Sequence, residues 1–261
     1  MKKKGVVFVV VMVAVAFLAM PLTSFAGGTI SGKVTYAGKA EEKDFSFAKF
    51  PNPKFCPKIP KKELSQGDKR TLKTIEVSGG GLKGAVVAVA DVEDKAFVDG
   101  YKGTEVVAEF CEFMPYTGVV VKMKNFHVEN HDADPDDPKS VKGVLHNPHS
   151  FEVMGASSST IFNIALAEKD SKLDKPAIMR KQGSMLRLQC DQHEFMQSFF
   201  WPVSNPHYAV AGNDGSFEIK DVPAGKHKLT VWHPFAGKGK AVEVEVDVPE
   251  GGKATVTAQI K

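Results

Sequence analysis

This chain has a small net charge, few cysteines and no apolar run long enough to span a membrane easily. Its 261 residues carry a formal charge of +3 at pH 7. Without residues 1–26, which hold three lysines and no acid, that charge falls to about zero. Proteins that bind nucleic acid usually carry a clustered basic surface. The most basic stretch, residues 58–73, contains Pro60 and two acidic residues, which favours a solvated loop over a nucleic-acid site.

The apolar run from Val6 to Met20 is short for a membrane-spanning helix. It follows three lysines, at positions 2–4, and precedes Ser24-Phe25-Ala26, whose small residues suit signal peptidase. We therefore expect residues 1–26 to be a signal peptide. The mature protein is expected to be periplasmic or secreted, with no membrane span. No cysteine follows the cleavage motif, so a lipid anchor is not expected.

The three cysteines are an odd number for an exported protein, so at least one thiol must stay outside an intramolecular disulfide. Cys56 and Cys111 can pair across a loop, which an oxidising compartment permits. That pairing leaves Cys190 free. The alternative is that Cys190 forms the disulfide and another cysteine is free.

Patterns typical of long helices are also missing. Short segments alternate apolar and polar residues between clusters of Gly, Pro, Asn and Asp, which predicts strands. Examples are residues 28–36, 185–189 and 242–248. The sequence therefore predicts an all-β fold of the sandwich type. We expect residues 28–36 to pair with the C-terminal strands.

Two motif-like stretches are better explained without a ligand. Residues 79–84 fit G-x-G-x-x-G, but β-branched residues rather than a helix follow, which favours a hairpin turn over a dinucleotide site. Residues 127–138 resemble the start of a calcium loop, but Pro135 interrupts the acids and the closing Glu is missing. We interpret this insertion as a solvated surface loop. His127 and His131 would suit zinc only on a helix, which the prolines disfavour.

The stretch Cys190-Asp191-Gln192-His193-Glu194-Phe195-Met196 offers a thiol, an imidazole and a thioether within seven residues. A thiolate and imidazoles in a trigonal arrangement, with a weak axial thioether, form a blue-copper electron-transfer site. A second imidazole must come from elsewhere. His146 is the best candidate, and His149 is the alternative. A single Met is usually a core residue and a single His a surface residue, but this spacing beside an unpaired cysteine favours copper.

These residues make the chain resemble the cupredoxins, the family of plastocyanin and azurin. The matching residues are Asn125, His146-Asn147, residues 190–196 and residues 205–210. Residues 214–219 and 222–225 resemble a carboxypeptidase-regulatory-like module of transthyretin-like fold, a carbohydrate-binding-like fold. The resemblance implies a Greek-key β-sandwich followed by a small β-sandwich module. The expected segments are residues 1–26 (signal peptide), 27–72 (N-terminal strand and extension), 73–204 (cupredoxin-like domain) and 205–261 (module).

The resemblance also implies one type 1 copper per chain, with His146, Cys190, His193 and Met196 as its ligands. Asn147 would brace the ligand loop and hydrogen-bond near the Cys190 sulfur. The chain departs from the family at Glu194-Phe195, where relatives commonly have Pro-Trp. Its loop from His to Met is also shorter than in plastocyanin.

The expected function is single-electron transfer without enzymatic activity, because no nucleophile–base pair is indicated. Partners would be redox proteins such as cytochromes, in transient contact. The alternatives are a copper carrier and a carbohydrate- or protein-binding β-sandwich. Trp232-His233-Pro234 could contribute to a sugar platform, although a Trp in an alternating strand is more often a core residue. The aromatic residues 195–201 are interpreted as hydrophobic packing.

Overall fold

The computed structural model describes residues 27–49, 55–59, 65–66 and 68–261. The expected signal peptide, residues 1–26, lies outside the described residues. The regular secondary structure of the described part is almost entirely β-strand, so the predicted all-β fold class is confirmed. Its helical segments are short: α1 (Lys95–Gly100), η1 (Phe47–Lys49), η2 (Cys56–Lys58) and η3 (Ala236–Gly239). None of the helices described there has the length and apolar character needed to cross a membrane.

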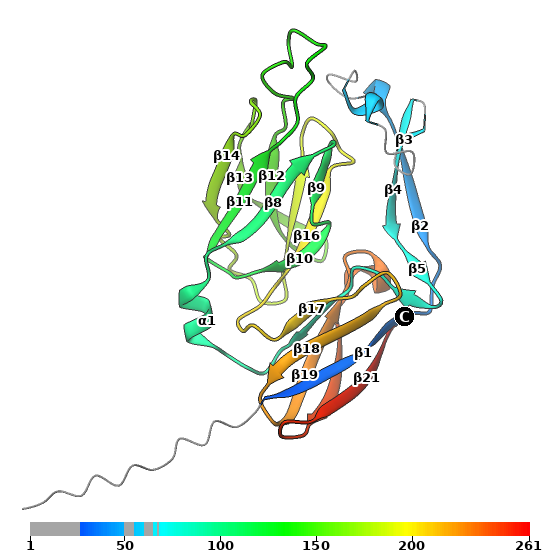
Figure 1. The fold of residues 1–261 in the computed structure, drawn as a ribbon, viewed down its shortest axis with the longest axis vertical. Helices are drawn as coiled ribbons and strands as arrows, with labels where there is room; N and C mark the ends of the chain where they lie inside the picture. The colour runs from blue at the N-terminus through cyan, green and yellow to red at the C-terminus, as the bar shows by residue number, and fades with distance from the viewer. Residues whose placement is uncertain (1–26, 50–54, 60–64, 67) are drawn as a thin grey trace, which may run out of the picture.

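The central part of the chain forms a sandwich of two sheets, green to yellow in Figure 1. One sheet has the order β10–β16–β15–β12–β13, and the other has the order β14–β11–β8–β9. The strands of the first sheet are β10 (Thr117–Val120), β12 (Pro148–Met154), β13 (Ser157–Asn163), β15 (Met185–Cys190) and β16 (Gln197–Pro202). Those of the second are β8 (Thr104–Glu109), β9 (Glu112–Met114), β11 (Asn125–Asn130) and β14 (Lys172–Pro176).

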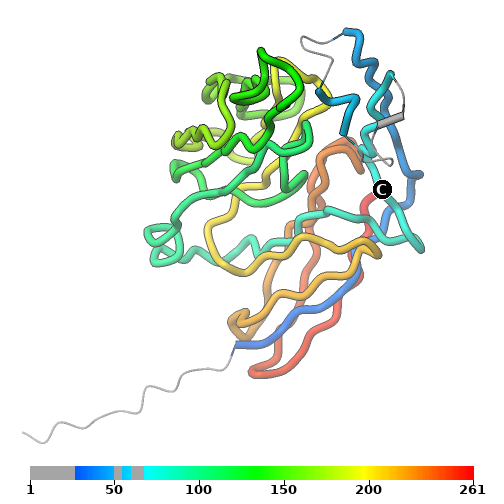
Figure 2. Tube along the Cα trace, turned by 45° about the horizontal axis from the view of Figure 1, so that its top comes forward, coloured from blue at the N-terminus to red at the C-terminus, as the bar shows by residue number. Residues whose placement is uncertain are grey.

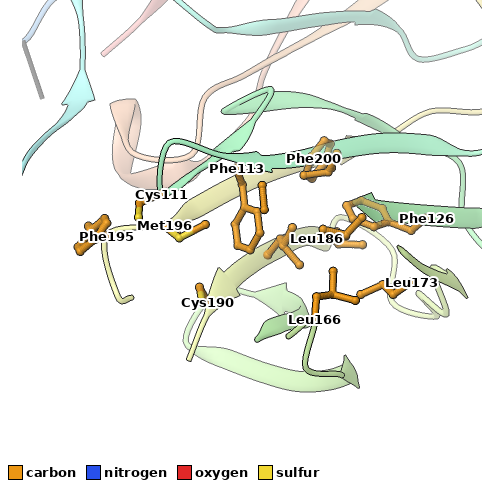
Figure 3. Packing of buried hydrophobic residues seen from close by; sticks show 14 of the residues in the cluster. Cys111, Phe113, Phe126, Leu166, Leu173, Leu186, Cys190, Phe195, Met196 and Phe200 are labelled. Carbon is orange, nitrogen blue, oxygen red and sulfur yellow. The ribbon is translucent and has the colours of Figure 1, made fainter. Parts of the chain in front are cut away.

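The core of this sandwich follows from strand alternation. In β15, Leu186, Leu188 and Cys190 are buried while the residues between them are partly exposed. Side chains at every second position point to the same face of a strand, so Cys190 is the last of an inward row. Figure 3 shows Leu186 of this row near Phe126, Leu173 and Phe200, and Cys190 belongs to the same cluster. The candidate ligand loop therefore begins at the end of the core.

A second β body joins the two ends of the chain. β1 pairs in parallel with β21 and antiparallel with β18, and blue β1 lies beside red β21 in Figure 1. The expected pairing of residues 28–36 with the C-terminal strands is thus confirmed. The strands of this body are β1 (Gly28–Tyr36), β5 (Val77–Ser78), β6 (Gly81–Leu82), β7 (Val86–Val89), β17 (Tyr208–Val210), β18 (Ser216–Val222), β19 (Gly225–Trp232), β20 (Val242–Val248) and β21 (Lys253–Ile260). Residues 73–204 therefore supply strands to both bodies.

β7 fixes the two bodies to each other. All of its residues are buried, as expected for a strand covered on both faces. Val87 and Val89 face the core of the second body, whereas Val86 and Ala88 belong to an apolar cluster with Phe199 and Trp232. The rings of Trp201 and Trp232 lie 5.1 Å apart in this contact. The aromatic stretch from Phe199 to Trp201 therefore packs, as interpreted from the sequence.

The third body is an arm that lies beside the sandwich (Figure 2). It consists of β2 (Glu41–Ser46), β3 (Ser65–Gln66) and β4 (Lys69–Ile75), in the order β2–β4–β3. A disulfide between Cys56 of η2 and Cys111 of the β8–β9 turn ties the arm to the sandwich. The pairing expected from the sequence is confirmed, and Cys190 is the free cysteine.

Candidate metal centre

The candidate ligand loop joins β15 to β16 as a closed turn. The Cys190 N–H donates to the Met196 carbonyl at 3.0 Å, and the Met196 N–H donates to the His193 carbonyl at 2.9 Å. The His193 N–H in turn donates to the Cys190 carbonyl at 3.3 Å. These bonds orient Cys190 and His193 toward the same side of the loop.

His146 reaches the same place through the register of the neighbouring strand. Pro148 at the start of β12 pairs with Cys190 at the end of β15. His146, two residues earlier, is held by two backbone hydrogen bonds with Leu166, of 3.1 and 2.8 Å. His146 and Cys190 are far apart in the sequence, and the pairing of β12 with β15 brings them next to each other.

Three side chains converge on one buried point. Nδ1 of His146 lies 3.3 Å from Nδ1 of His193, and the Cys190 Sγ lies 4.0 Å and 3.7 Å from these two nitrogens. All three residues are almost fully buried. Atoms that share a metal, with bonds of about 2.0 Å to nitrogen and about 2.3 Å to sulfur, lie roughly 3 to 4 Å apart. The donor set and its spacing therefore fit one thiolate-binding metal ion such as copper.

Asp132 holds His146 from the far side of the ring. The His146 Nε2–H donates to the Asp132 carboxylate at 2.8 Å, and both side chains are buried. The same carboxylate accepts from the backbone N–H groups of Phe110 and Cys111, at 2.7 and 2.9 Å. Because Nε2 is engaged by Asp132, Nδ1 is the ring nitrogen that can bind a metal ion. A carboxylate behind the ring is a common device for orienting a metal-binding histidine.

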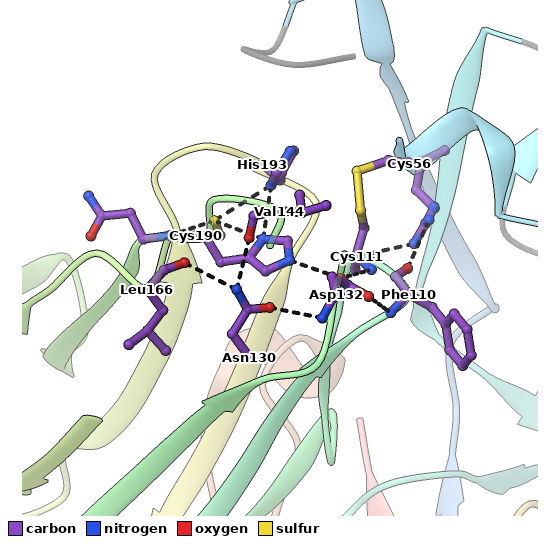
Figure 4. Close-up of polar contacts among 12 residues, drawn as sticks. Cys56, Phe110, Cys111, Asn130, Asp132, Val144, Leu166, Cys190 and His193 are labelled. Carbon is purple, nitrogen blue, oxygen red and sulfur yellow. Dashed lines mark hydrogen bonds and ion pairs between the residues drawn. A yellow bond between two sulfur atoms is a disulfide. The ribbon is translucent and has the colours of Figure 1, made fainter. Parts of the chain in front are cut away.

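Asn130 holds Asp132 in position. Neither Asn130 nor Asp132 was identified as a site residue from the sequence. Its side-chain amide donates to the carbonyls of Val144 and Leu166, and its Oδ1 accepts from the Asp132 N–H (Figure 4). Asn130, Asp132 and Asp134 are buried. The interpretation of residues 127–138 as a solvated loop is therefore wrong for its first half, where β11 continues to Asn130.

Asn147 contacts the cysteine sulfur through its backbone rather than its side chain. Its N–H points to the Cys190 Sγ at 3.3 Å. The Oδ1 of Asn147 is buried and has no hydrogen-bond partner among the described residues. The backbone amide of Asn147 is therefore positioned as a hydrogen-bond donor to the sulfur.

The two imidazoles differ in their tendency to bind a proton. Burial alone lowers the pKa of His146, but its hydrogen bond to Asp132 and the nearby Cys190 sulfur outweigh burial and raise that pKa to about 9. Burial, together with the positive charge of His146, lowers the pKa of His193 to about 3. The pair therefore carries one positive charge, on His146, and a metal ion bound at Nδ1 of His146 would displace the extra proton.

The remaining predicted residues lie at different depths. Met196 is fully buried in the same cluster as Cys190 and Phe195 (Figure 3), and its axial role stays a prediction. His149, the alternative upstream ligand, turns away from the centre, because its Nδ1 contacts the Asp191 carboxylate at 3.0 Å and its Nε2 contacts Thr160. Trp232 is 1 % exposed, so it offers no face to a sugar.

The arm covers the centre. Phe45 and Phe47 pack edge-on against Phe195, with ring centroids 6.2 and 5.7 Å away. The Phe195 ring lies 5.7 Å from the His193 ring. His193 is 1 % exposed, and its Nε2 is buried without a hydrogen-bond partner among the described residues. No part of the His193 ring edge is therefore open to a partner protein. The sequence carried no signal for this cover.

A second group of potential ligands lies on the outer face of β11. Glu129, His131 and Asp170 bring their donor atoms within 4.8 Å of one another. However, the Lys172 ammonium already contacts the Glu129 carboxylate at 3.0 Å. Because this ammonium group already neutralises the Glu129 carboxylate, the group is a weaker candidate for a metal site. His127 lies on the same strand, not on the helix that zinc binding would require.

Comparison with known proteins finds only distant likenesses. Neither a model of a known protein family nor a curated protein matches the chain. Among solved structures, a Cu-containing nitrite reductase from Thermus scotoductus SA-01 is similar at 11 % identity and a TM-score of 0.30, over 40 % of this chain and 23 % of that chain. A reduced Cu(I) form of an amicyanin mutant is similar at 14 % identity and a TM-score of 0.29, over 46 % of this chain and all of that chain. TM-scores of this size establish neither a shared fold nor a shared function.

Proposed function

We propose that the protein is a type 1 copper protein that carries single electrons between redox partners. His146, Cys190 and His193 would bind the metal, and Met196 would be a weaker fourth ligand. The observation that carries the proposal is the buried convergence of two imidazole nitrogens on the only free thiol of the chain. Copper, when bound, supplies a one-electron couple.

The residues around the centre support fast transfer because they limit movement. Asp132 fixes the His146 ring, the backbone of Asn147 approaches the sulfur, and three backbone hydrogen bonds close the ligand loop. A centre whose ligands are already in place needs little rearrangement between oxidation states. Apolar packing by Phe195 and Met196 keeps water out, which also influences the reduction potential.

The proposal extends to partners and compartment. A disulfide in the described structure fits an oxidising compartment, which supports a periplasmic or secreted location. Partners would be redox proteins such as cytochromes, and no enzymatic reaction is assigned. Because His193 is covered, a partner would contact the surface where the arm meets the ligand loop. Exposed Lys43 of the arm and Glu194 of the loop lie 3.8 Å apart there.

The second candidate is a copper carrier. The burial of both imidazoles favours it, because a shuttle usually needs a ligand close to its surface. A carrier would hold Cu(I) and show no strong colour as Cu(II). The carbohydrate-binding alternative loses its main support, because Trp232 is buried.

A copper titration of the purified mature protein tests the proposal. Wild type should bind one equivalent of Cu(II) and develop an intense thiolate-to-copper absorption band with a narrow copper EPR splitting. Cys190→Ser should lose the band. Colourless wild type with Cu(I) bound at one equivalent would favour the carrier, and no stoichiometric uptake of either ion would exclude both.

A further inference from the structure

The arm, the sandwich and the second β body enclose a cleft of about 810 Å³. Leu72 and Lys73 line it from the arm, residues 112–117 line it from the sandwich, and residues 210–213 line it from the second body. Sites for small organic molecules commonly measure about 300 to 1,000 Å³ and lie where domains meet. The position and the size of the cleft match such a site.

One wall of the cleft is apolar and aromatic. Phe113 and Phe195 contribute rings, and Met114, Pro115 and Leu72 contribute aliphatic surface. Phe113 and Phe195 are buried in the sandwich core, which holds their rings in place. A rigid wall of this kind suits a flat apolar body.

Two buried polar side chains on the cleft offer hydrogen-bond donors. The Tyr116 hydroxyl is buried and has no partner among the described residues, and burial, with the Glu76 carboxylate, raises its pKa. His233 accepts the backbone N–H groups of Phe235 and Ala236 with its Nδ1. Burial lowers the pKa of His233 to about 4, so its proton resides on Nε2. A buried donor without a partner is uncommon, and a bound acceptor would satisfy it.

Among the charged side chains that line the cleft, Lys73 is the one without an ion-pair partner in the described residues. The Lys83 ammonium pairs with Glu76 at 2.9 Å, and Glu112 faces the Arg70 guanidinium at 3.7 Å. Lys73 makes no ion pair with any residue in the described ranges. The side chains of the cleft that have no partner among the described residues therefore include three hydrogen-bond donors: the Tyr116 hydroxyl, the His233 Nε2–H and the Lys73 ammonium.

We propose that this cleft binds a small aromatic carboxylate. Its flat body would lie against the accessible apolar surface of Leu72, Met114 and Pro115, which Phe113 and Phe195 support from behind, and its carboxylate would accept hydrogen bonds from Tyr116, His233 or Lys73. This site is separate from the candidate metal centre and does not require copper. Only the Phe195 side chain separates the cleft from the candidate metal centre, because Phe195 lines the cleft and also contacts His193.

Calorimetric titration of the metal-free full-length mature protein with 1-naphthoate tests the proposal. Val210 is exposed on β17 and lines the cleft, so Val210→Trp should fill the cleft without disturbing a core. Val141 is a second exposed valine, away from the cleft, and Val141→Trp is the matched control. Tyr116→Phe removes only the unpartnered hydroxyl.

Wild type and Val141→Trp should bind 1-naphthoate with a Kd below about 1 mM. Val210→Trp should weaken binding at least about tenfold, and Tyr116→Phe should weaken it about 2- to 10-fold, the effect of one neutral hydrogen bond. The cation 1-naphthalenemethylamine should bind more weakly than 1-naphthoate. Absence of saturable binding, equal affinity in Val210→Trp, or preference for the amine would overturn the proposal. None of these results depends on whether Cys190 binds copper.

Discussion

The Asp132 carboxylate accepts a hydrogen bond from Nε2–H of His146 at 2.8 Å inside the protein. The two residues come from different sides of the insertion between β11 and β12. Their contact turns the other ring nitrogen of His146 toward Cys190 and His193. The orientation of the candidate metal centre therefore depends on a residue outside the ligand motif.

Replacement of this carboxylate should weaken copper binding without removing a ligand. We expect Asp132→Asn to lower copper affinity about 10- to 100-fold, because the ring loses its fixed tautomer and orientation. Competition with a chelator of known affinity measures the change. Asp134→Asn is the matched control, because Asp134 is buried in the same segment but pairs with Lys58. Equal losses in both variants would mean that Asp132 acts only through the fold.

The predicted axial ligand can be tested by a swap of similar volume. Met196→Leu should change the free energy of unfolding by less than about 1.5 kcal/mol, since Leu and Met fill similar space. Copper should stay bound, and the reduction potential should rise because Cu(II) loses a weak donor. Met179→Leu, at another buried methionine of the same core, should leave the potential unchanged. If voltammetry gives the same potential for both variants, Met196 is a core residue only.

The disulfide should control access to the centre. The double variant Cys56→Ser/Cys111→Ser opens a link between residues separated by 55 positions, which should cost about 4 kcal/mol of unfolding free energy. Urea denaturation measures that loss. As the arm loosens, Cys190 should react faster with an aromatic disulfide reagent than it does in the wild type, where it is buried. An unchanged labelling rate would show that the arm does not shield the thiol.

His233 should make stability fall in mild acid. Its folded pKa is about 4 because of burial, below the usual value of about 6.5 in an unfolded chain. Between these pH values the unfolded state binds more protons, so the free energy of unfolding decreases as pH falls from about 6.5 to about 4, by about 3 kcal/mol in all.

His233→Asn isolates this effect, because an amide oxygen can replace Nδ1 as the acceptor for residues 235 and 236. The difference in unfolding free energy between wild type and variant should shrink as pH falls through this range. A constant difference would contradict the assignment.

The motif of residues 190–196 could be recognised from the sequence because its candidate ligands are close together in the chain. Cys190 and His193 share one turn, and the odd cysteine count indicated a free thiol. His146 could be chosen only with the help of the cupredoxin resemblance. The structure brings it, and not His149, to the centre through the pairing of β12 with β15.

Other features depend on contacts that no local pattern encodes. Asp132 lies among acids and prolines that favour solvent exposure, yet it is buried by hydrogen bonds to Phe110 and Cys111. Likewise, residues 37–72 lack a clear period, and the docking of Phe45 and Phe47 onto Phe195 is determined by tertiary packing. The cover over His193 and the cleft beside it are products of how the three bodies assemble.

Copper K-edge X-ray absorption of the loaded protein tests the central claim most directly, namely that His146, Cys190 and His193 share one metal. The account predicts one sulfur and two imidazole nitrogens as near neighbours of copper, with the sulfur replaced by a lighter atom in Cys190→Ser. Nitrogen and oxygen neighbours alone in the wild type would contradict it, because copper would then be bound elsewhere.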